Sequence, residues 1–324
     1  MLPALPLRDR AVALSGVFFG APVCAEYLQS YLGINILEML AALLFFGPLY
    51  GGAALLVREL AVRTGRGWRG ILLLSAAFGV AMPGLVDLSL FEANRDDVDY
   101  WNELRLPTLV EPLGISVFPS IAWVSGHVLM SVGAPLALLN GLAPRHRNRP
   151  LLGRVGIVVV AALCLSTMIL VHSQARGTAA PTTTQTAVVL AIIAIVIVLA
   201  ATPFGRPVAN PGMTQPVPKW LVLSLGITGM LIYDFTPPTW FGVGAAVAVL
   251  AAAAGALHRL PRHRDWNDHD IATLACGALV GRTLTGFFAP NPAGVSALTK
   301  YSSNALLLLL VLGLSWAVLV RSDS

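Results

Sequence analysis

Charged residues are scarce in this sequence. Lys, Arg, Asp and Glu make up 11% of its 324 residues, hydrophobic residues make up 56%, and the mean hydropathy is +0.76. Soluble domains carry about 25% charged residues, so the composition excludes an ordinary soluble protein and indicates a polytopic membrane domain. The net charge of +5 comes from short loops, which an anionic membrane surface explains better than nucleic acid does.

Cysteine is also rare. Cys24, Cys164 and Cys276 are widely spaced within apolar segments, which argues against a disulfide framework and against a zinc site. The sequence has no motif of metal-ligating residues and no nucleophile motif, so we expect no metal and no cofactor.

Two acidic strings are close to known metal motifs. Asp96-Asp97-Val98-Asp99 differs from the DDxxD motif of prenyl-transferring enzymes because Tyr100 stands where the third aspartate would fall, and we interpret it as a solvated loop. Asp265-Trp266-Asn267-Asp268-His269-Asp270 could hold a metal, but its aspartates also suit the first turn of a helix, and we favour that interpretation.

Apolar segments dominate the rest of the chain, and most are near the length of about 20 residues that a helix needs to cross a bilayer. They cover residues 11–32, 35–57, 70–91, 113–142, 153–172, 186–203, 219–235, 240–257, 270–290 and 303–320. We therefore predict an all-α fold, a polytopic integral membrane helix bundle of about ten transmembrane helices (8–10), as a single transmembrane domain over residues 1–324. The seventh and eighth segments are short, so a re-entrant course is an alternative for them.

Basic residues alternate between the gaps that separate these segments. Sixteen of the 21 Lys and Arg residues fall in every second gap, and four fall in the others. By the positive-inside rule, both termini are predicted to be cytoplasmic in a bacterial plasma membrane. The same alternation puts ten of the sixteen acidic residues on or toward the outer side.

Ionisable residues at membrane depth are costly, so each is a candidate for function. The catalytic candidates are Glu26, Asp87, Glu38, His127 and Asp234, and the aromatic residues expected to bind substrate are Tyr27, Phe91, Trp123 and Tyr233. Most of them fall in a front half, residues 1–172. The back half, residues 186–324, is expected to be mainly close-packed scaffold, with runs of small residues such as Ala251-Ala252-Ala253-Ala254.

Each candidate also has a purely structural interpretation. Glu38 and Asp234 could be interfacial polar residues, and His127 could be a hydrogen-bonded packing histidine. Arg282, the only basic residue deep inside a segment, is expected to neutralise a buried acid. The i, i+4 spacing of Glu59 and Arg63 predicts a surface ion pair.

The stretch Leu49-Tyr50-Gly51-Gly52-Ala53-Ala54-Leu55-Leu56-Val57-Arg58-Glu59-Leu60, continuing to Trp68, resembles a family of uncharacterised multi-pass bacterial membrane proteins. The resemblance covers about residues 15–155. The same pattern is loosely similar to that of the CAAX-protease and bacteriocin-processing superfamily. The resemblance implies a Glu-Glu-Gly-Leu element, but this chain has Ala81-Met82-Pro83-Gly84-Leu85 at the matching place. The resemblance also implies a later histidine, and His127 matches it. Without the paired glutamates, a protease mechanism lacks the base that activates water.

The remaining acids, histidine and aromatic residues predict proton-initiated chemistry. A buried carboxylic acid can protonate an alkene or epoxide while aromatic faces stabilise the carbocation. In type, the chain is similar to the small integral-membrane terpene cyclases of bacterial and fungal pathways. The leading hypothesis is a metal-independent terpene cyclase acting on a hydrophobic isoprenoid substrate, with Glu26 or Asp87 as proton donor and His127 or Glu38 as final proton acceptor.

Three alternatives stay open on the sequence. They are a proton-coupled transporter, a degenerate protease-like partner or immunity protein, and a magnesium-dependent membrane prenyltransferase. In each alternative the protein lies in the lipid bilayer, and we expect no nucleic acid as a partner. The sequence predicts no oligomeric state.

Overall fold

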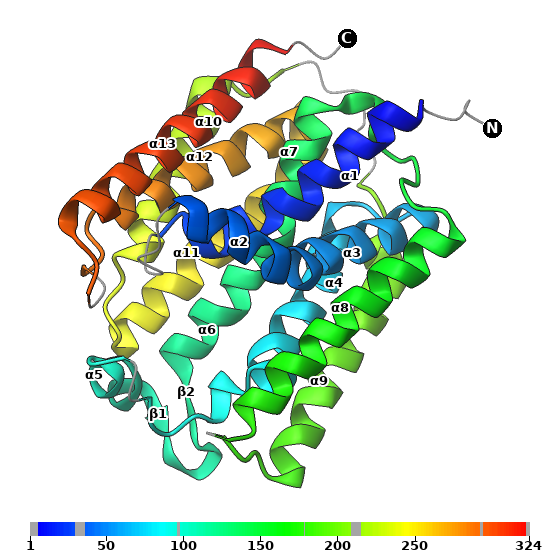
Figure 1. The fold of residues 1–324 in the computed structure, drawn as a ribbon. Helices are drawn as coiled ribbons and strands as arrows, with labels where there is room; N and C mark the ends of the chain where they lie inside the picture. Colours follow the sequence, from blue (N-terminus) through cyan, green and yellow to red (C-terminus); the bar gives the residue numbers. More distant parts are fainter. Residues whose placement is uncertain are drawn as a thin grey trace.

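The computed structural model describes residues 6–29, 36–95, 98–177, 179–208, 215–291 and 294–321. The chain is 80% helical, which confirms the all-α class. Within the described residues, strands β1 (Leu109–Val110) and β2 (Ile115–Ser116) form one short antiparallel pair. Figure 1 shows this pair at the end of the bundle opposite the N-terminus.

Thirteen helices account for most of the described residues. They are α1 (Leu7–Pro22), α2 (Ile36–Phe46), α3 (Gly52–Arg63), α4 (Trp68–Ala81), α5 (Trp101–Arg105), α6 (Val117–Gly126), α7 (Ala134–Leu142), α8 (Arg154–Ala175), α9 (Thr183–Ala201), α10 (Lys219–Asp234), α11 (Trp240–His263), α12 (Asp268–Gly286) and α13 (Ala297–Val320). Several of them continue into π-helical turns, which are η1 (Val23–Tyr27), η2 (Gly47–Gly51), η3 (Met82–Val86) and η7 (His127–Gly133).

Seven helical segments among the described residues are long and apolar enough to cross a membrane. They are Leu37–Arg63, Trp68–Val86, Val117–Leu142, Arg154–Ala175, Thr183–Ala201, Trp240–His263 and Ala297–Val320. In α8, in α9 and in α11 only 11% of the apolar window is buried inside the protein. These helices present apolar side chains outward, as helices in a lipid bilayer do. The count of about ten and the side of the termini stay predictions.

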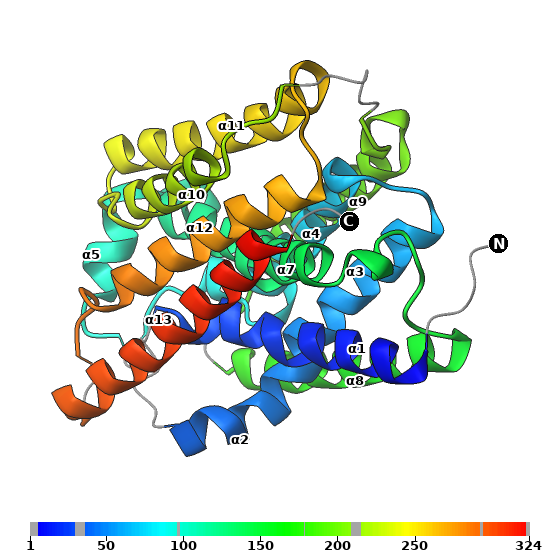
Figure 2. The ribbon, with the colours of Figure 1, turned by 90° about the horizontal axis from the view of Figure 1, so that it is seen from above.

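The centre of the back half is α12, which packs against α10, α13 and α7 (Figure 2). Its close contact with α10 depends on two glycines, because a Cβ on Gly277 would overlap the carbonyl oxygen of Leu223 and a Cβ on Gly226 would overlap that of Leu274. Small residues let helix backbones approach in this way within membranes. The run Ala251–Ala254 on α11 is exposed, so the expectation that it mediates close packing was wrong.

Glu59 lies in a buried polar network instead of on the surface. Its side chain is 3% exposed and pairs with Arg58 at 3.3 Å and with Arg63 at 3.1 Å. The Leu151 backbone N–H donates to the same carboxylate at 2.6 Å. The prediction of a surface ion pair was therefore wrong, because helical spacing alone does not show what covers a helix face.

The two arginines extend this network to the segment between α7 and α8. Arg58 donates to the carbonyl oxygens of His146 at 2.6 Å and Arg149 at 3.0 Å. Arg63 donates to the Leu152 carbonyl at 2.6 Å. One carboxylate and two guanidinium groups thus hold this segment on the end of α3.

The acidic string before α12 forms a helix cap, as we had interpreted it. The Asn267 side chain accepts from the backbone N–H groups of His269 and Asp270, and Asp270 accepts from the Asn267 N–H. Such a reciprocal cap satisfies N–H groups that the first helical turn leaves unpaired. Asp268 also accepts from the Trp68 indole at 2.5 Å, which ties α12 to the start of α4.

The alternation of basic loops predicts that Thr64 and Glu103 lie on opposite sides of the membrane. Both residues are exposed and the three native cysteines are buried, so a cysteine at either position reports its side with little background. We expect a membrane-impermeant maleimide to label Glu103→Cys in intact cells and Thr64→Cys only after permeabilisation. Labelling of Thr64→Cys in intact cells would contradict cytoplasmic termini.

Glu59→Gln is expected to destabilise the protein strongly, because it leaves the buried Arg58 guanidinium without its counter-charge. Breaking a buried ion pair by removing one partner costs about 3–5 kcal/mol. The measurement is the thermal unfolding midpoint and folded yield in detergent. Glu103→Gln, at an exposed position of α5, is the control, and equal stability of the two variants would show that the network contributes little.

Candidate functional site

Four helices contain π turns, and these turns meet in one region of the bundle. A π turn closes each backbone hydrogen bond one residue further along the chain than an α turn does, and such turns are frequent at functional sites. The turn η7 contacts both η1 and η2, and α4, which continues into η3, packs against η7. The irregular parts of separate helices are therefore neighbours.

A proline accompanies each of these turns. Pro22 precedes η1, Pro48 lies in η2, Pro83 lies in η3, and Pro135 follows η7 by two residues. Proline lacks a backbone N–H, and its ring clashes with the carbonyl group four residues earlier, so a helix that continues through it must change its hydrogen bonding. The sequence therefore encodes these turns.

Glu26 is the carboxyl group at the centre of this region. It lies in η1 and is 9% exposed. The Tyr50 side chain, which comes from η2 and is 5% exposed, forms a hydrogen bond with it. Asp87 and Arg282 lie close enough to Glu26 to interact with it electrostatically. An acid and a phenol from two separate helices are therefore in direct contact inside the protein.

His127 adds an imidazole to this pair. It is the first residue of η7, and its ring stacks on that of Tyr50, with centroids 5.7 Å apart and planes at 22°. The Phe78 ring meets the imidazole edge-on at 5.7 Å, and His127 Nδ1 lies 3.2 Å from the Ser131 hydroxyl. The imidazole is thus held in a fixed orientation. We call Glu26, Tyr50 and His127 the buried Glu26 cluster.

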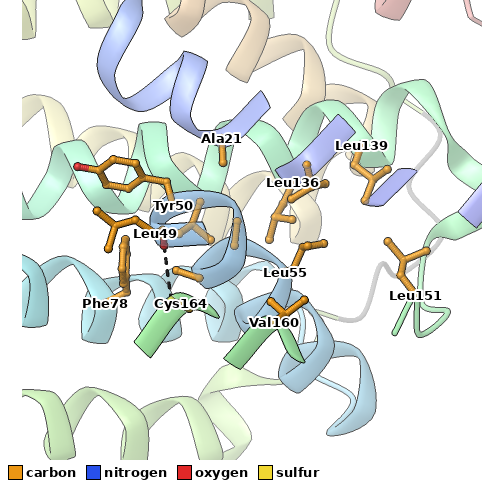
Figure 3. Close-up of a cluster of buried hydrophobic side chains, with 14 of the residues drawn as sticks. Ala21, Leu49, Tyr50, Leu55, Phe78, Leu136, Leu139, Leu151, Val160 and Cys164 are labelled. Atoms are coloured by element: carbon orange, nitrogen blue, oxygen red, sulfur yellow. Dashed lines mark hydrogen bonds between the residues drawn. The ribbon is translucent and has the colours of Figure 1, made fainter. Parts of the chain in front are cut away.

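Further aromatic rings pack around Tyr50. Phe46 lies 5.9 Å from Tyr50 and 6.4 Å from Tyr27 between centroids, and Phe78 lies 6.4 Å from Tyr50. Figure 3 shows Tyr50 and Phe78 at one edge of a buried apolar cluster, with the Tyr50 hydroxyl pointing away from the aliphatic side chains. The Tyr27 hydroxyl donates to the Met39 carbonyl at 2.6 Å, which fixes this ring between η1 and α2.

Asp234 and Arg282 form an ion pair beside the cluster. Their side chains are 3% and 14% exposed, and the Thr285 hydroxyl donates to the same Asp234 carboxylate at 2.8 Å. The expectation that Arg282 neutralises a buried acid is confirmed. Asp234 has a charged partner, so its environment is that of a structural carboxylate. Both residues belong to the back half, which therefore contributes charge close to Glu26.

Tyr233, the neighbour of Asp234 on α10, is 8% exposed. Its hydroxyl lies 2.5 Å from that of Ser125 on α6. This hydrogen bond links the back half to the helix that carries His127.

Asp87 follows directly after η3, just beyond the apolar segment Trp68–Val86. Its carboxylate accepts from the backbone N–H of Ser89 at 2.9 Å and from the Ser89 hydroxyl at 2.6 Å. Burial raises the pKa of Asp87, while the two hydrogen bonds from Ser89 oppose that rise. The next residue, Leu88, is buried with a φ of 56°, a left-handed conformation that is uncommon outside glycine. Strained backbone of this kind clusters at functional sites.

Three of the predicted site residues lie away from the cluster. Glu38 is exposed in the first turn of α2. Phe91 is half-buried in a short 3-10 turn, Ser89–Phe91. The Trp123 ring stacks on Trp101 at 6.0 Å, and this is its only ring contact among the described residues.

Sequence reasoning missed Tyr50, Phe46 and Phe78. Tyr50 lies in the stretch Leu49-Tyr50-Gly51-Gly52. An uncharged tyrosine within an apolar segment is a weaker signal of function than a charged residue is. The usable signal was the proline at position 48, which marks the turn that presents Tyr50. Asp96 and Asp97 of the acidic string lie outside the described residues. Within those that are described, no group of three or more His, Cys, Asp or Glu residues is arranged to hold a metal.

The fold and the buried polar cluster define the class of the protein, a multi-pass α-helical membrane protein. A sequence model described as "Uncharacterized membrane protein family" matches residues 14–319, and the chain belongs to this family. The match is consistent with the resemblance to an uncharacterised multi-pass membrane family over residues 15–155, and it shows no link to the CAAX-protease superfamily or to terpene cyclases. No curated protein and no solved structure matches it.

Arg282→Met is expected to destabilise the protein by about 3–5 kcal/mol, because Asp234 then remains buried without its partner. The double variant Arg282→Met/Asp234→Leu replaces both charges with apolar groups and should recover most of the loss. Thermal unfolding in detergent measures both effects. If the double variant is as unstable as the sum of the two single variants, the residues do not act as a pair.

Proposed function

We propose that the protein transfers a proton inside the membrane and that Glu26 is the group that gives or takes it. The observation that carries this proposal is the contact between the buried Glu26 carboxyl and Tyr50, whose ring stacks on His127 at 5.7 Å. Carboxyl, phenol and imidazole groups are the usual agents of general acid–base catalysis. Ionisable residues within a membrane domain are functional by default because burying them is costly.

The reaction that this site fits best is proton-initiated cyclisation of a lipophilic isoprenoid. The Glu26 carboxyl would protonate an alkene or epoxide, the resulting carbocation would close a ring by adding an internal alkene, and His127 would remove a proton to leave a neutral product. Support comes from the aromatic rings of Tyr27, Phe46 and Phe78 around the acid, since such rings stabilise cations. This chemistry makes the protein a metal-independent enzyme of the terpene cyclase type.

Proton-coupled transport is the second candidate, and a separate observation favours it. The π turn η7 contacts η1 and η2, and Glu26 in η1 lies within electrostatic range of Arg282. Transporters often place their sites where helices are interrupted within the membrane. In such a protein Glu26 would carry the coupled proton and no chemical change of the substrate would follow. The two functions use the same carboxyl group but leave different products.

The experiment compares lipid extracts of cells that express wild type, Glu26→Gln, Asp87→Asn or no protein. We expect a product that only wild-type cells contain, reduced about a hundredfold or more in Glu26→Gln because a general acid contributes at least that factor. The matched control is Glu38→Gln, an acid-to-amide change at an exposed position, which should keep the product. Equal amounts of each variant in the membrane fraction exclude failed insertion.

The remaining outcomes decide between the candidates. Full product formation by both Glu26→Gln and Asp87→Asn would reject acid catalysis. Solute uptake or export that depends on a proton gradient, that Glu26→Gln abolishes and that leaves the solute chemically unchanged would favour transport.

A further inference from the structure

A large groove with a volume of about 1180 Å³ is lined by residues of α1, α7, α12 and α13. Most of its lining is apolar and comes from these four helices, for example Val17, Leu138, Leu279 and Val311. Glu26 is not among the lining residues, so the groove is separate from the buried Glu26 cluster, and the proposal for the groove does not depend on the proposed function.

The groove is open to the surroundings along its length. Val12 on α1 and Leu310 on α13 line it and are 67% and 47% exposed. From Arg8 to Cys24, both in the lining, the helix rises on the order of 24 Å. One acyl chain covers half of a hydrocarbon core of about 30 Å, so the groove is long enough to hold it.

One end of the groove is strongly basic. Arg8, Arg145 and Arg321 line this end and are all exposed. Among the residues that the structure describes, none of these three arginines forms an ion pair. They come from the start of α1, the loop after α7 and the end of α13. Asp9 is the one acid in the lining, so the local balance is positive.

Two buried histidines lie beside these arginines and have unused hydrogen-bonding atoms. His146 is 5% exposed, and neither of its ring nitrogens has a partner among the described residues. His269 is 4% exposed; its Nε2 lies 2.8 Å from the Val318 carbonyl oxygen, but its Nδ1 has no partner in the described part of the chain. Both residues line the groove. A buried polar atom without a partner is costly and points to a bound group.

We propose that this groove is a binding site for one anionic phospholipid. The phosphate group lies among Arg8, Arg145 and Arg321, where His146 can also bond to it, and an acyl chain lies along the apolar part between α1 and α13. The basic end is the side that the positive-inside rule assigns to the cytoplasm, where anionic lipids are concentrated. Arginine side chains can hold the phosphate through charge-assisted hydrogen bonds, and the local positive charge favours a headgroup of net negative charge over a zwitterionic one.

The test measures lipid bound to the purified full-length protein by native mass spectrometry. The protein is offered equal amounts of phosphatidylglycerol and phosphatidylcholine with the same acyl chains, and inorganic phosphate in a separate sample. We expect one phosphatidylglycerol per chain, with a preference over phosphatidylcholine of about tenfold or more, because three arginines attract a headgroup of net negative charge and repel the choline ammonium group. The triple variant Arg8→Gln/Arg145→Gln/Arg321→Gln should lose this preference.

A second variant fills the groove without disturbing the fold. Gly20 lines the groove, and a Cβ placed on it meets no atom within 4 Å, so Gly20→Leu is expected to fold and to lose bound lipid about tenfold. Gly313 on α13 also has open space but lies outside the lining, and Gly313→Leu is the matched control that should bind as wild type does.

Three outcomes would overturn the proposal. They are equal binding of the two lipids by wild type, equal binding by Gly20→Leu and Gly313→Leu, and binding of inorganic phosphate as strong as that of phosphatidylglycerol. The last outcome would assign the basic end to a free anion instead of a lipid.

Discussion

The structure depends on one constraint, which is that backbone N–H and C=O groups in hydrocarbon must be hydrogen-bonded within the protein. A membrane helix can therefore change its course only where another pattern replaces the α pattern. In this chain that pattern is the π turn, and Pro22, Pro48, Pro83 and Pro135 mark its four occurrences. The turns keep the backbone paired while they shift side chains around the helix. Their meeting point is where Glu26, Tyr50 and His127 come together.

Two kinds of buried charge serve different purposes in this bundle. Glu59 and Asp234 each have arginine partners and several hydrogen bonds, so they hold segments together. Glu26 instead contacts a neutral phenol beside a stacked imidazole. The stretch from Leu49 to Trp68 contributes to the buried Glu26 cluster and to the Glu59 network. Its Tyr50 contacts Glu26, and its Arg58, Glu59 and Arg63 hold the segment before α8. Gly51 in the same stretch allows the Phe18 carbonyl to approach where a Cβ would overlap it.

The sequence predicted the helical class, the presence of several apolar membrane-spanning helices, the place of Asp268 and Asp270 in a first helical turn and the burial of Glu26, because these follow from composition and local periodicity. It did not predict that Glu59 is buried or that the run Ala251–Ala254 is exposed. Both errors have one cause, since helical spacing gives the face of a residue but not the neighbour that covers it. Tyr50 and Phe78 were missed because their ring contacts with each other and with His127 join different helices, which only the assembled bundle brings together.

The central claim is that proline-linked π turns gather Glu26, Tyr50 and His127 into one buried cluster. An electron cryomicroscopy structure of the protein in lipid nanodiscs tests this most directly. The account predicts breaks in the α pattern at the four prolines, the Tyr50 hydroxyl within hydrogen-bonding distance of the Glu26 carboxylate, and the His127 ring stacked on Tyr50. Continuous α-helices through these positions, with Glu26 facing lipid or separated from Tyr50, would contradict it.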